Sequence, residues 1–202
     1  MSEFLAADIP GTYLLPLLLV VLLLALLAVY RRRNRKLRRL RKVFAAIGFD
    51  RIDGLLIPSA DEGEIQIDHL LLTSEGLLIV DIKDVNGAVF GSDKMQDWTV
   101  ISDDHRFTIA NPQHALYDRI AAVRQIVRQV PVTGRILFLD DAEFTKGMPG
   151  LVCTLDSLFD EFSEKDGAVG KVKVEAFQPH WDLIRDAAIS GQFGRASKRP
   201  LV

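Results

Sequence analysis

The sequence predicts a mixed α/β domain, in which helices flank a mixed sheet, preceded by one N-terminal transmembrane helix. Residues 12–30 form an apolar stretch without a charged side chain. Two apolar runs of strand length, 64–73 and 77–83, are separated by a short turn. Apolar residues then recur at helical spacing near 112–130 and 179–190. Strands and helices in this order are typical of a mixed sheet with helices packed on it.

The apolar stretch has the length of a membrane span. Its 19 residues would rise about 28 Å as a helix, close to the thickness of a bilayer's hydrocarbon core. Tyr13 and Tyr30 bracket it, as expected of rings that lie at the two interfaces. A cleaved signal peptide is disfavoured, because the preceding residues are acidic and arginines follow directly. We therefore expect an extracytoplasmic N-terminus at 1–11 and an uncleaved anchor at 12–30.

A basic run after the apolar stretch predicts the orientation. Residues 31–42 hold nine Lys and Arg, whereas no basic residue precedes them, so the C-terminal side should face the cytoplasm at the inner (plasma) membrane. Apolar residues at helical spacing predict a juxtamembrane helix over 31–48, with Gly48 as its C-cap. Its first basic residues are expected to contact anionic headgroups of the lipid bilayer: Arg31, Arg32, Arg33, Arg35 and Lys36.

The remainder of the chain is acidic. Setting aside the basic run and the two N-terminal acids, Glu3 and Asp8, leaves 16 basic and 25 acidic residues and a formal net charge of −9. This balance disfavours tight nucleic-acid binding, which depends on neutralising phosphates. The single cysteine, Cys153, lies in an apolar run and is interpreted as a buried small residue in a reducing compartment.

We expect one soluble domain over 49–192 and a loose C-terminal tail at 193–202. Turn residues and apolar runs predict its strands at 50–58, 64–73, 77–83, 88–90, 97–101, 106–109, 134–140 and 150–154. Helices are predicted from Asn111-Pro112 to about Val130, over 155–163 with Thr154 or Asp156 as N-cap, and over 179–190.

The stretch 67–84, IDHLLLTSEGLLIVDIKD, carries the candidate chemistry. If its hairpin is symmetric about Ser74-Glu75, paired residue numbers sum to 149 and Asp68 faces Asp81. A bulged turn that uses Gly76 would instead leave the two acids diagonal. Lys83 follows Asp81 by two residues and so shares its face.

Two facing carboxylates repel each other unless a cation lies between them. Hard oxygen ligands suit Mg²⁺, which would polarise a phosphodiester and activate water, while Lys83 orients that water or stabilises the developing charge. The alternative is a strand that emerges into solvent at Asp81, with Lys83 and Asp68 as surface neighbours.

The same stretch resembles the nuclease-related domain (NERD) family, which has a restriction-endonuclease-like fold. The resemblance spans about residues 40–130 and rests on an ordered set of positions: Asp68-His69, Gly76, Asp81-Ile82-Lys83, Gly87, Gly91, Trp98 and Asn111-Pro112. It implies a nuclease that hydrolyses phosphodiester bonds of DNA or RNA with Mg²⁺ or Mn²⁺.

The resemblance also implies roles for particular residues. Asp68, Asp81 and the main-chain carbonyl of Ile82 would bind metal, and Lys83 would be the catalytic lysine. Asn111 and Gln113 would border the site at a helix start. Arg124, on the same helix, is a candidate phosphate contact, with a solvated surface position as the alternative.

This chain departs from the family pattern at several positions. Asp81 stands where the family usually has Glu, Gln66 and Ala115 replace a Glu and a Gln, and residues 31–49 contain no acid. Two alternatives therefore stay open: a catalytically degenerate scaffold with the same fold, and an adaptor that binds lipid or protein at the cytoplasmic membrane face.

Overall fold

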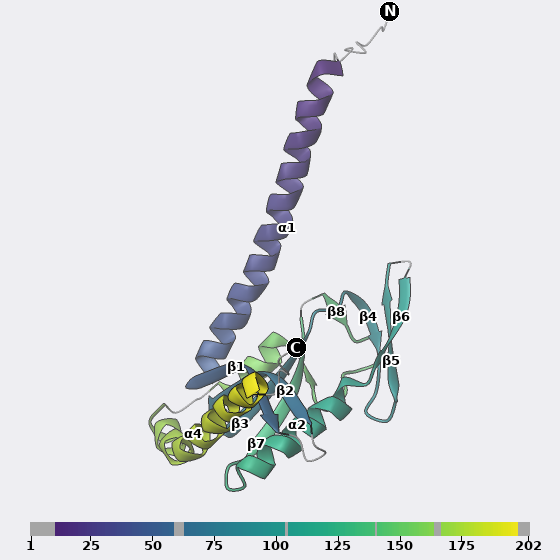
Figure 1. The fold of residues 1–202 in the computed structure, drawn as a ribbon. Coiled ribbons are helices and arrows are strands. Elements are labelled where there is room, and N and C mark those ends of the chain that lie inside the picture. Colours follow the sequence, from purple (N-terminus) through teal and green to yellow (C-terminus); the bar gives the residue numbers. More distant parts are fainter. Residues whose placement is uncertain (1–10, 59–62, 104, 140, 164–166, 198–202) are drawn as a thin grey trace, which may run out of the picture. The chain divides into compact units, whose positions relative to one another are not determined.

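The computed structural model describes residues 11–58, 63–103, 105–139, 141–163 and 167–197 (Figure 1). Contacts divide the chain into two units, 1–41 and 42–202, which we take in turn. The helices are α1 (Gly11–Ile47), α2 (Pro112–Ile126), α3 (Leu155–Phe162) and α4 (Gly167–Ser197). The strands are β1 (Asp50–Pro58), β2 (Glu64–Thr73), β3 (Gly76–Lys83), β4 (Gly87–Phe90), β5 (Asp97–Ser102), β6 (His105–Ala110), β7 (Val132–Phe138), β8 (Ala142–Glu143) and β9 (Val152–Cys153).

The first unit is helical from Gly11 onward, as part of α1. The side chains at 16–31 are exposed, and all of them up to Tyr30 are uncharged. Among the residues that the structure describes, no helix is long and apolar enough to cross a membrane, so the expected span at 12–30 is not supported. The expected extracytoplasmic segment lies almost entirely in residues 1–10, outside the described ranges.

The second unit is built on a five-stranded mixed sheet of order β1-β2-β3-β7-β9. β3 lies at its centre, antiparallel to β2 and parallel to β7. Pairs such as His69 with Val80 and Thr73 with Gly76 confirm the symmetric hairpin register. Gly76 closes this hairpin with φ +119°, and an added Cβ would lie 2.3 Å from the carbonyl oxygen of Pro131, so both backbone and space require glycine there.

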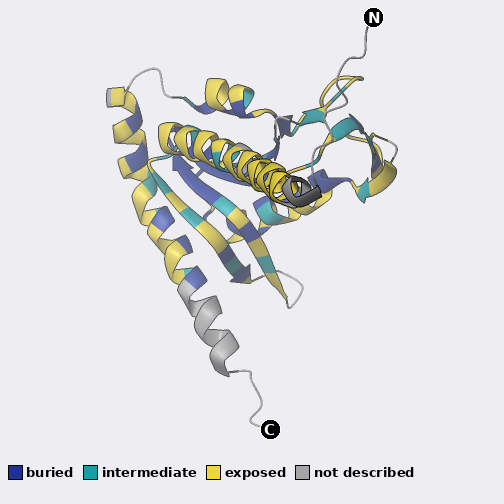
Figure 2. Ribbon diagram, turned by 90° about the horizontal axis from the view of Figure 1, so that it is seen from above, coloured by how far each residue is buried: buried dark blue, intermediate teal, exposed yellow. Residues whose placement is uncertain are grey.

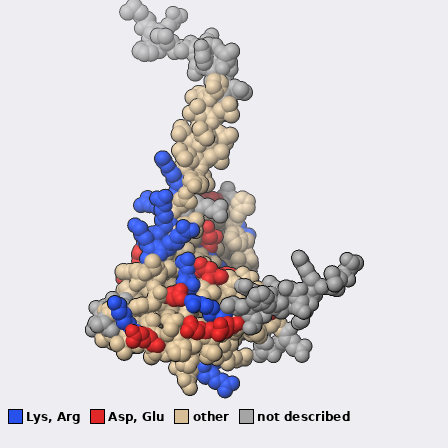
Figure 3. All heavy atoms as spheres, turned by 60° about the vertical axis from the view of Figure 1, so that its left-hand side comes forward, with Lys and Arg blue, Asp and Glu red and all other residues tan. Residues whose placement is uncertain are grey.

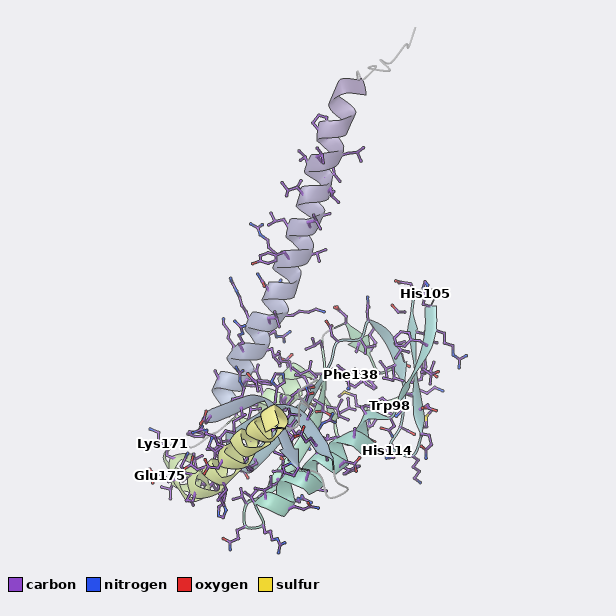
Figure 4. All side chains as sticks on the ribbon, in the orientation of Figure 1. Trp98, His105, His114, Phe138, Lys171 and Glu175 are labelled. Carbon is purple, nitrogen blue, oxygen red and sulfur yellow. The ribbon has the colours of Figure 1, made fainter. Side chains whose placement is uncertain are left out.

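The short strands between β3 and α2 differ from the single sheet that the sequence predicted. They form a second, four-stranded sheet of order β6-β5-β4-β8, in which β8 had not been predicted (Figure 1). Stacked and edge-to-face rings fasten this sheet to the end of β7. Trp98 of β5 lies 6.2 Å from Phe138 of β7 between ring centroids (Figure 4). The ring of Phe144 lies edge-on to both.

Helices cover the larger sheet, and the buried residues concentrate on its strands (Figure 2). Helices α2 and α4 contribute Leu116, Val123 and Trp181 to one core with these strands. The C-terminal turn of α1 contacts β2, because the ring of Phe44 lies edge-on to His69. The predicted end of α1 before Gly48 is confirmed, because the Gly48 amide donates to the carbonyl of Phe44.

Two helix boundaries were predicted wrongly. α2 ends at Ile126, four residues before the expected Val130, because Val127 is already extended. α4 begins at Gly167 and contains Pro179, which had been taken as the helix start; the helix continues to Ser197, through much of the tail expected to be loose. The Thr154 N-cap of α3 is confirmed, with Ser157 completing a capping box.

Candidate active site

Asp81 is the only acidic residue of β3, and it is buried. Its side chain is 4% exposed, because the central strand is covered along its first six residues. Oδ2 accepts a hydrogen bond of 2.9 Å from Nη1 of Arg119. Oδ1 is buried without a hydrogen-bond partner among the described residues. Such an oxygen is costly to bury and suits an additional cation or water.

Burial sets the protonation of this carboxyl. It raises the pKa of Asp81 above the usual 3.8, and the positive charges of Arg119 and Lys83 offset part of that effect. Asp68 lies near enough for its negative charge to raise the pKa of Asp81 further. Asp68 and Lys83, the two residues expected to share the site with Asp81, therefore both act electrostatically on its carboxyl.

Asp68 is exposed, in contrast to Asp81. Its Oδ1 accepts 3.0 Å from Nε2 of Gln66, two residues before it on β2. The β1–β2 pairing continues on either side of Gly54, which puts Asp68 opposite this glycine. Gly54 has φ +67°, and a Cβ built there meets nothing within 4 Å. Asp68 thus borders open space, as a residue that receives a ligand from solvent must.

Lys83 is the last residue of β3 and is half-buried. It pairs with Phe138 of β7, and its carbonyl accepts from the amide of Leu139. Ile82 pairs with Leu137 in the same ladder. The backbone at 82–83 is therefore held on the β7 side, and the alternation of β3 keeps the Lys83 side chain on the face of Asp81.

Arg119 joins two strands at this site, a contact that the sequence did not predict. Nε donates 2.8 Å to the carbonyl of Gln66 on β2, and Nη1 binds Asp81 on β3. Its side chain is 22% exposed. Arg119 follows the buried Leu116 by three residues and precedes the buried Val123 by four. This spacing places it at the border of the inward face of α2, and is the signal that could have identified it.

The donor set fits a Mg²⁺ ion better than a metal held wholly by protein ligands. No group of three or more His, Cys, Asp and Glu side chains suited to a metal occurs within the described ranges. Mg²⁺, however, is commonly held by one or two carboxylates together with waters and substrate phosphate. The free Oδ1 of Asp81, the exposed Asp68 and the carbonyl of Ile82 are hard oxygen donors of that kind.

Asn111 and Gln113 lie at the start of α2, where they were expected, but both are buried and bonded within the protein. The Asn111 side chain caps α2 by accepting from the Gln113 amide, and donates to the carbonyl of Met95. Gln113 donates 2.8 Å to Asp93, which also accepts from the amide of Gly150. These bonds lower the pKa of Asp93 and connect the loops at 91–96 and 144–151 to the start of the helix.

The other predicted contact residues are distributed differently. Arg124 uses Nη2 to donate to the carbonyl of Val132 at the start of β7. In the basic run, Arg31 and Arg35 are exposed and Lys36 is half-buried with an interaction of its own; the side chains of Arg32 and Arg33 lie outside the described set. Figure 3 shows the basic side chains gathered along the part of α1 that follows its apolar stretch.

Comparisons with known proteins assign the fold of this site to a family. The profile of the nuclease-related domain (NERD) matches residues 30–139, just over half of the chain. An uncharacterized protein of Bacillus anthracis, pXO1-01, is 31% identical over 64 residues, which are 32% of this chain and 30% of that protein. The chain thus spans less than a third of this relative, and no solved structure matches it. The match over 30–139, which includes the whole of β2, β3 and α2, shows that the chain belongs to the nuclease-related domain family.

Proposed function

We propose that this protein hydrolyses phosphodiester bonds of DNA or RNA with Mg²⁺ or Mn²⁺. The observation that carries the proposal is the buried carboxylate of Asp81, which has one oxygen without a hydrogen bond to any described residue. Asp68 and Lys83 lie near enough for their charges to affect its pKa. Membership of the nuclease-related family supports the same reaction class.

Each residue has a distinct part in this proposal. Asp81, Asp68 and the carbonyl of Ile82 would hold the metal, whose chemistry is to polarise the phosphate and lower the pKa of bound water. Asp81 is fixed by burial, whereas Asp68 is accessible from solvent. The ammonium of Lys83 orients the attacking water and stabilises the charge that develops on phosphate. Arg124 and the start of α2, at Asn111 and Gln113, would border the bound nucleic acid.

Cleavage by the full-length chain tests the proposal. Single- and double-stranded DNA and RNA are incubated with Mg²⁺ or Mn²⁺, and Lys83→Ala is compared with Lys171→Ala, a control on the exposed surface of α4. We expect Lys83→Ala to lower the rate by a factor of about 10² to 10³ and Lys171→Ala to leave it unchanged. If none of these substrates is cleaved with either metal, the proposed reaction is refuted.

A second candidate, a catalytically degenerate scaffold, is favoured by the ion pair at the site. Arg119 already neutralises Asp81 without a metal, and residues 43–202 carry a formal net charge of −9. A scaffold predicts that Mg²⁺ leaves the melting temperature unchanged. A rise with Mg²⁺ that disappears in Asp68→Asn contradicts it.

The proposed location is the cytoplasmic face of the inner membrane, with residues 12–30 as a single anchor and the N-terminus outside. The uncharged stretch and the nine basic residues after it support this arrangement. Extraction of membranes at alkaline pH should leave the protein in the pellet. A cysteine introduced by Ser2→Cys should react with an impermeant maleimide from outside, and reaction only after lysis refutes this orientation.

A further inference from the structure

Arg119 binds Asp81 through Oδ2 of the same carboxylate to which the proposed metal chemistry brings a cation. Its guanidinium is fixed at two points, the Asp81 carboxylate at 2.9 Å and the Gln66 carbonyl at 2.8 Å. These partners lie on adjacent strands, so the arginine bridges β2 and β3 beside the metal-binding residues. Arginine stays charged at every physiological pH, so this bridge cannot be released by deprotonation.

We propose that Arg119 is a latch that competes with the divalent metal for Asp81. The inference rests on the proposed function, because it names the regulation of that same site. The described arrangement is then the closed state, in which a built-in cation stabilises the buried carboxylate. Metal binds when its interaction with Asp81 and Asp68 outweighs the guanidinium's hold on Oδ2 and on Gln66.

The formal charges of the site give the direction of this competition. Asp68 and Asp81 contribute two negative charges, and Arg119 and Lys83 contribute two positive ones, so the site is neutral before a metal enters. A divalent ion at Oδ1 of Asp81 would share one carboxylate with the guanidinium on Oδ2. Like charges at such a separation repel strongly in a partly buried site. Removing Arg119 should therefore strengthen metal binding, although it removes a residue of the site.

A second arginine of α2 supplies a matched control. Arg124 also donates to a strand carbonyl, that of Val132, at 2.8 Å, but this partner carries no formal charge. Arg119→Met and Arg124→Met therefore each remove one guanidinium from the same helix and one bond to a strand carbonyl. Only the first also removes a cation from Asp81.

The test measures Mn²⁺ binding to the full-length chain by the electron paramagnetic resonance signal of free Mn²⁺. We expect Arg119→Met to bind at least about tenfold more tightly than the unsubstituted protein, which corresponds to about 1.4 kcal/mol. Arg124→Met should leave the affinity unchanged. Asp81→Asn combined with Arg119→Met should abolish the gain. Equal or weaker binding by Arg119→Met, or binding by neither protein, overturns the latch.

A second measurement covers the case in which Arg119→Met does not fold. Mg²⁺ is titrated into the unsubstituted protein while the arginine Nε–H signals are followed by nuclear magnetic resonance, with the Arg119 signal assigned by its loss in Arg119→Lys. Its shift on saturation, with that of Arg124 unchanged, supports displacement, and an unmoved Arg119 signal overturns it. Tighter Mn²⁺ binding without cleavage would retain the latch and refute the nuclease. Cleavage by the unsubstituted protein, with the Mn²⁺ affinity unchanged in Arg119→Met, would retain the nuclease and refute the latch.

Discussion

Replacing Arg119 with methionine in metal-free buffer should destabilise the fold by about 3 kcal/mol at pH 7. The variant leaves Asp81 nearly inaccessible, with 4% of its side chain exposed, and without its ion-pair partner. Breaking a buried ion pair by removing one member costs roughly 3–5 kcal/mol. Arg119 itself is 22% exposed, so water can reach part of the vacated space, which places the expected loss at the lower end.

Protonation of Asp81 sets an independent ceiling on this loss. The carboxyl can avoid an unpaired charge by taking up a proton, at about 1.36 kcal/mol for each pH unit above its ordinary pKa. From the ordinary value of 3.8, the ceiling is about 4.4 kcal/mol at pH 7 and about 1.6 kcal/mol at pH 5. The destabilisation should therefore shrink as the pH falls.

Chemical denaturation of the full-length protein with a chelator present, at pH 7 and pH 5, measures both values. Arg124→Met is the control, and we expect it to lose about 1 kcal/mol for one hydrogen bond, equally at both pH values. In an Asp81→Asn background, Arg119→Met should cost less than about 1 kcal/mol. A loss that is independent of pH, or equal in the two backgrounds, would refute the role of the Asp81 charge.

Three further outcomes are expected. Because burial raises the pKa of Asp81, its ionisation lowers stability as the pH rises through that value, so Asp81→Asn should gain stability relative to the unsubstituted protein as the pH rises above the ordinary value of 3.8 in denaturation without metal. Asp93 has a lowered pKa, so Asp93→Asn should be less stable at neutral pH, and the difference should shrink in melting curves as the pH falls below the ordinary Asp pKa of 3.8. Gly76→Ala should lose about 3 kcal/mol or more, from φ +119° and contact with a carbonyl oxygen, whereas Gly54→Ala, at φ +67° in open space, should lose about 1 kcal/mol in denaturant titrations.

The strands could be predicted wherever one local signal dominated. Continuous apolar runs on either side of Ser74-Glu75 predicted β2, β3 and their register, because a tight symmetric turn leaves few alternatives. The short strands were predicted, but their separation into a second sheet was not. A local sequence pattern indicates a strand without indicating which sheet the strand joins. The N-terminal half of α4 was missed because Pro179 was interpreted as a start, whereas a long helix can accommodate it inside.

The candidate site was predicted only in part, for a related reason. Asp81 and Lys83 followed from alternation along one strand, and Asp68 from the hairpin register. The approach of α2 to β3 depends on how the helix packs across the sheet. The contact between Arg119 and Asp81 could therefore not be predicted from the sequence of the hairpin alone. The burial of Asn111 and Gln113 likewise results from a loop at 91–96 that folds back onto the helix start.

The ring stack between the two sheets has a consequence for the lysine. Phe138, which stacks on Trp98, is also the backbone partner of Lys83 across the β3–β7 ladder. A displacement of the smaller sheet that moves the phenyl ring of Phe138 should therefore also shift the backbone of Lys83, and with it the ammonium group, because the two residues are paired in the ladder. The smaller sheet is in this way coupled to the candidate catalytic lysine.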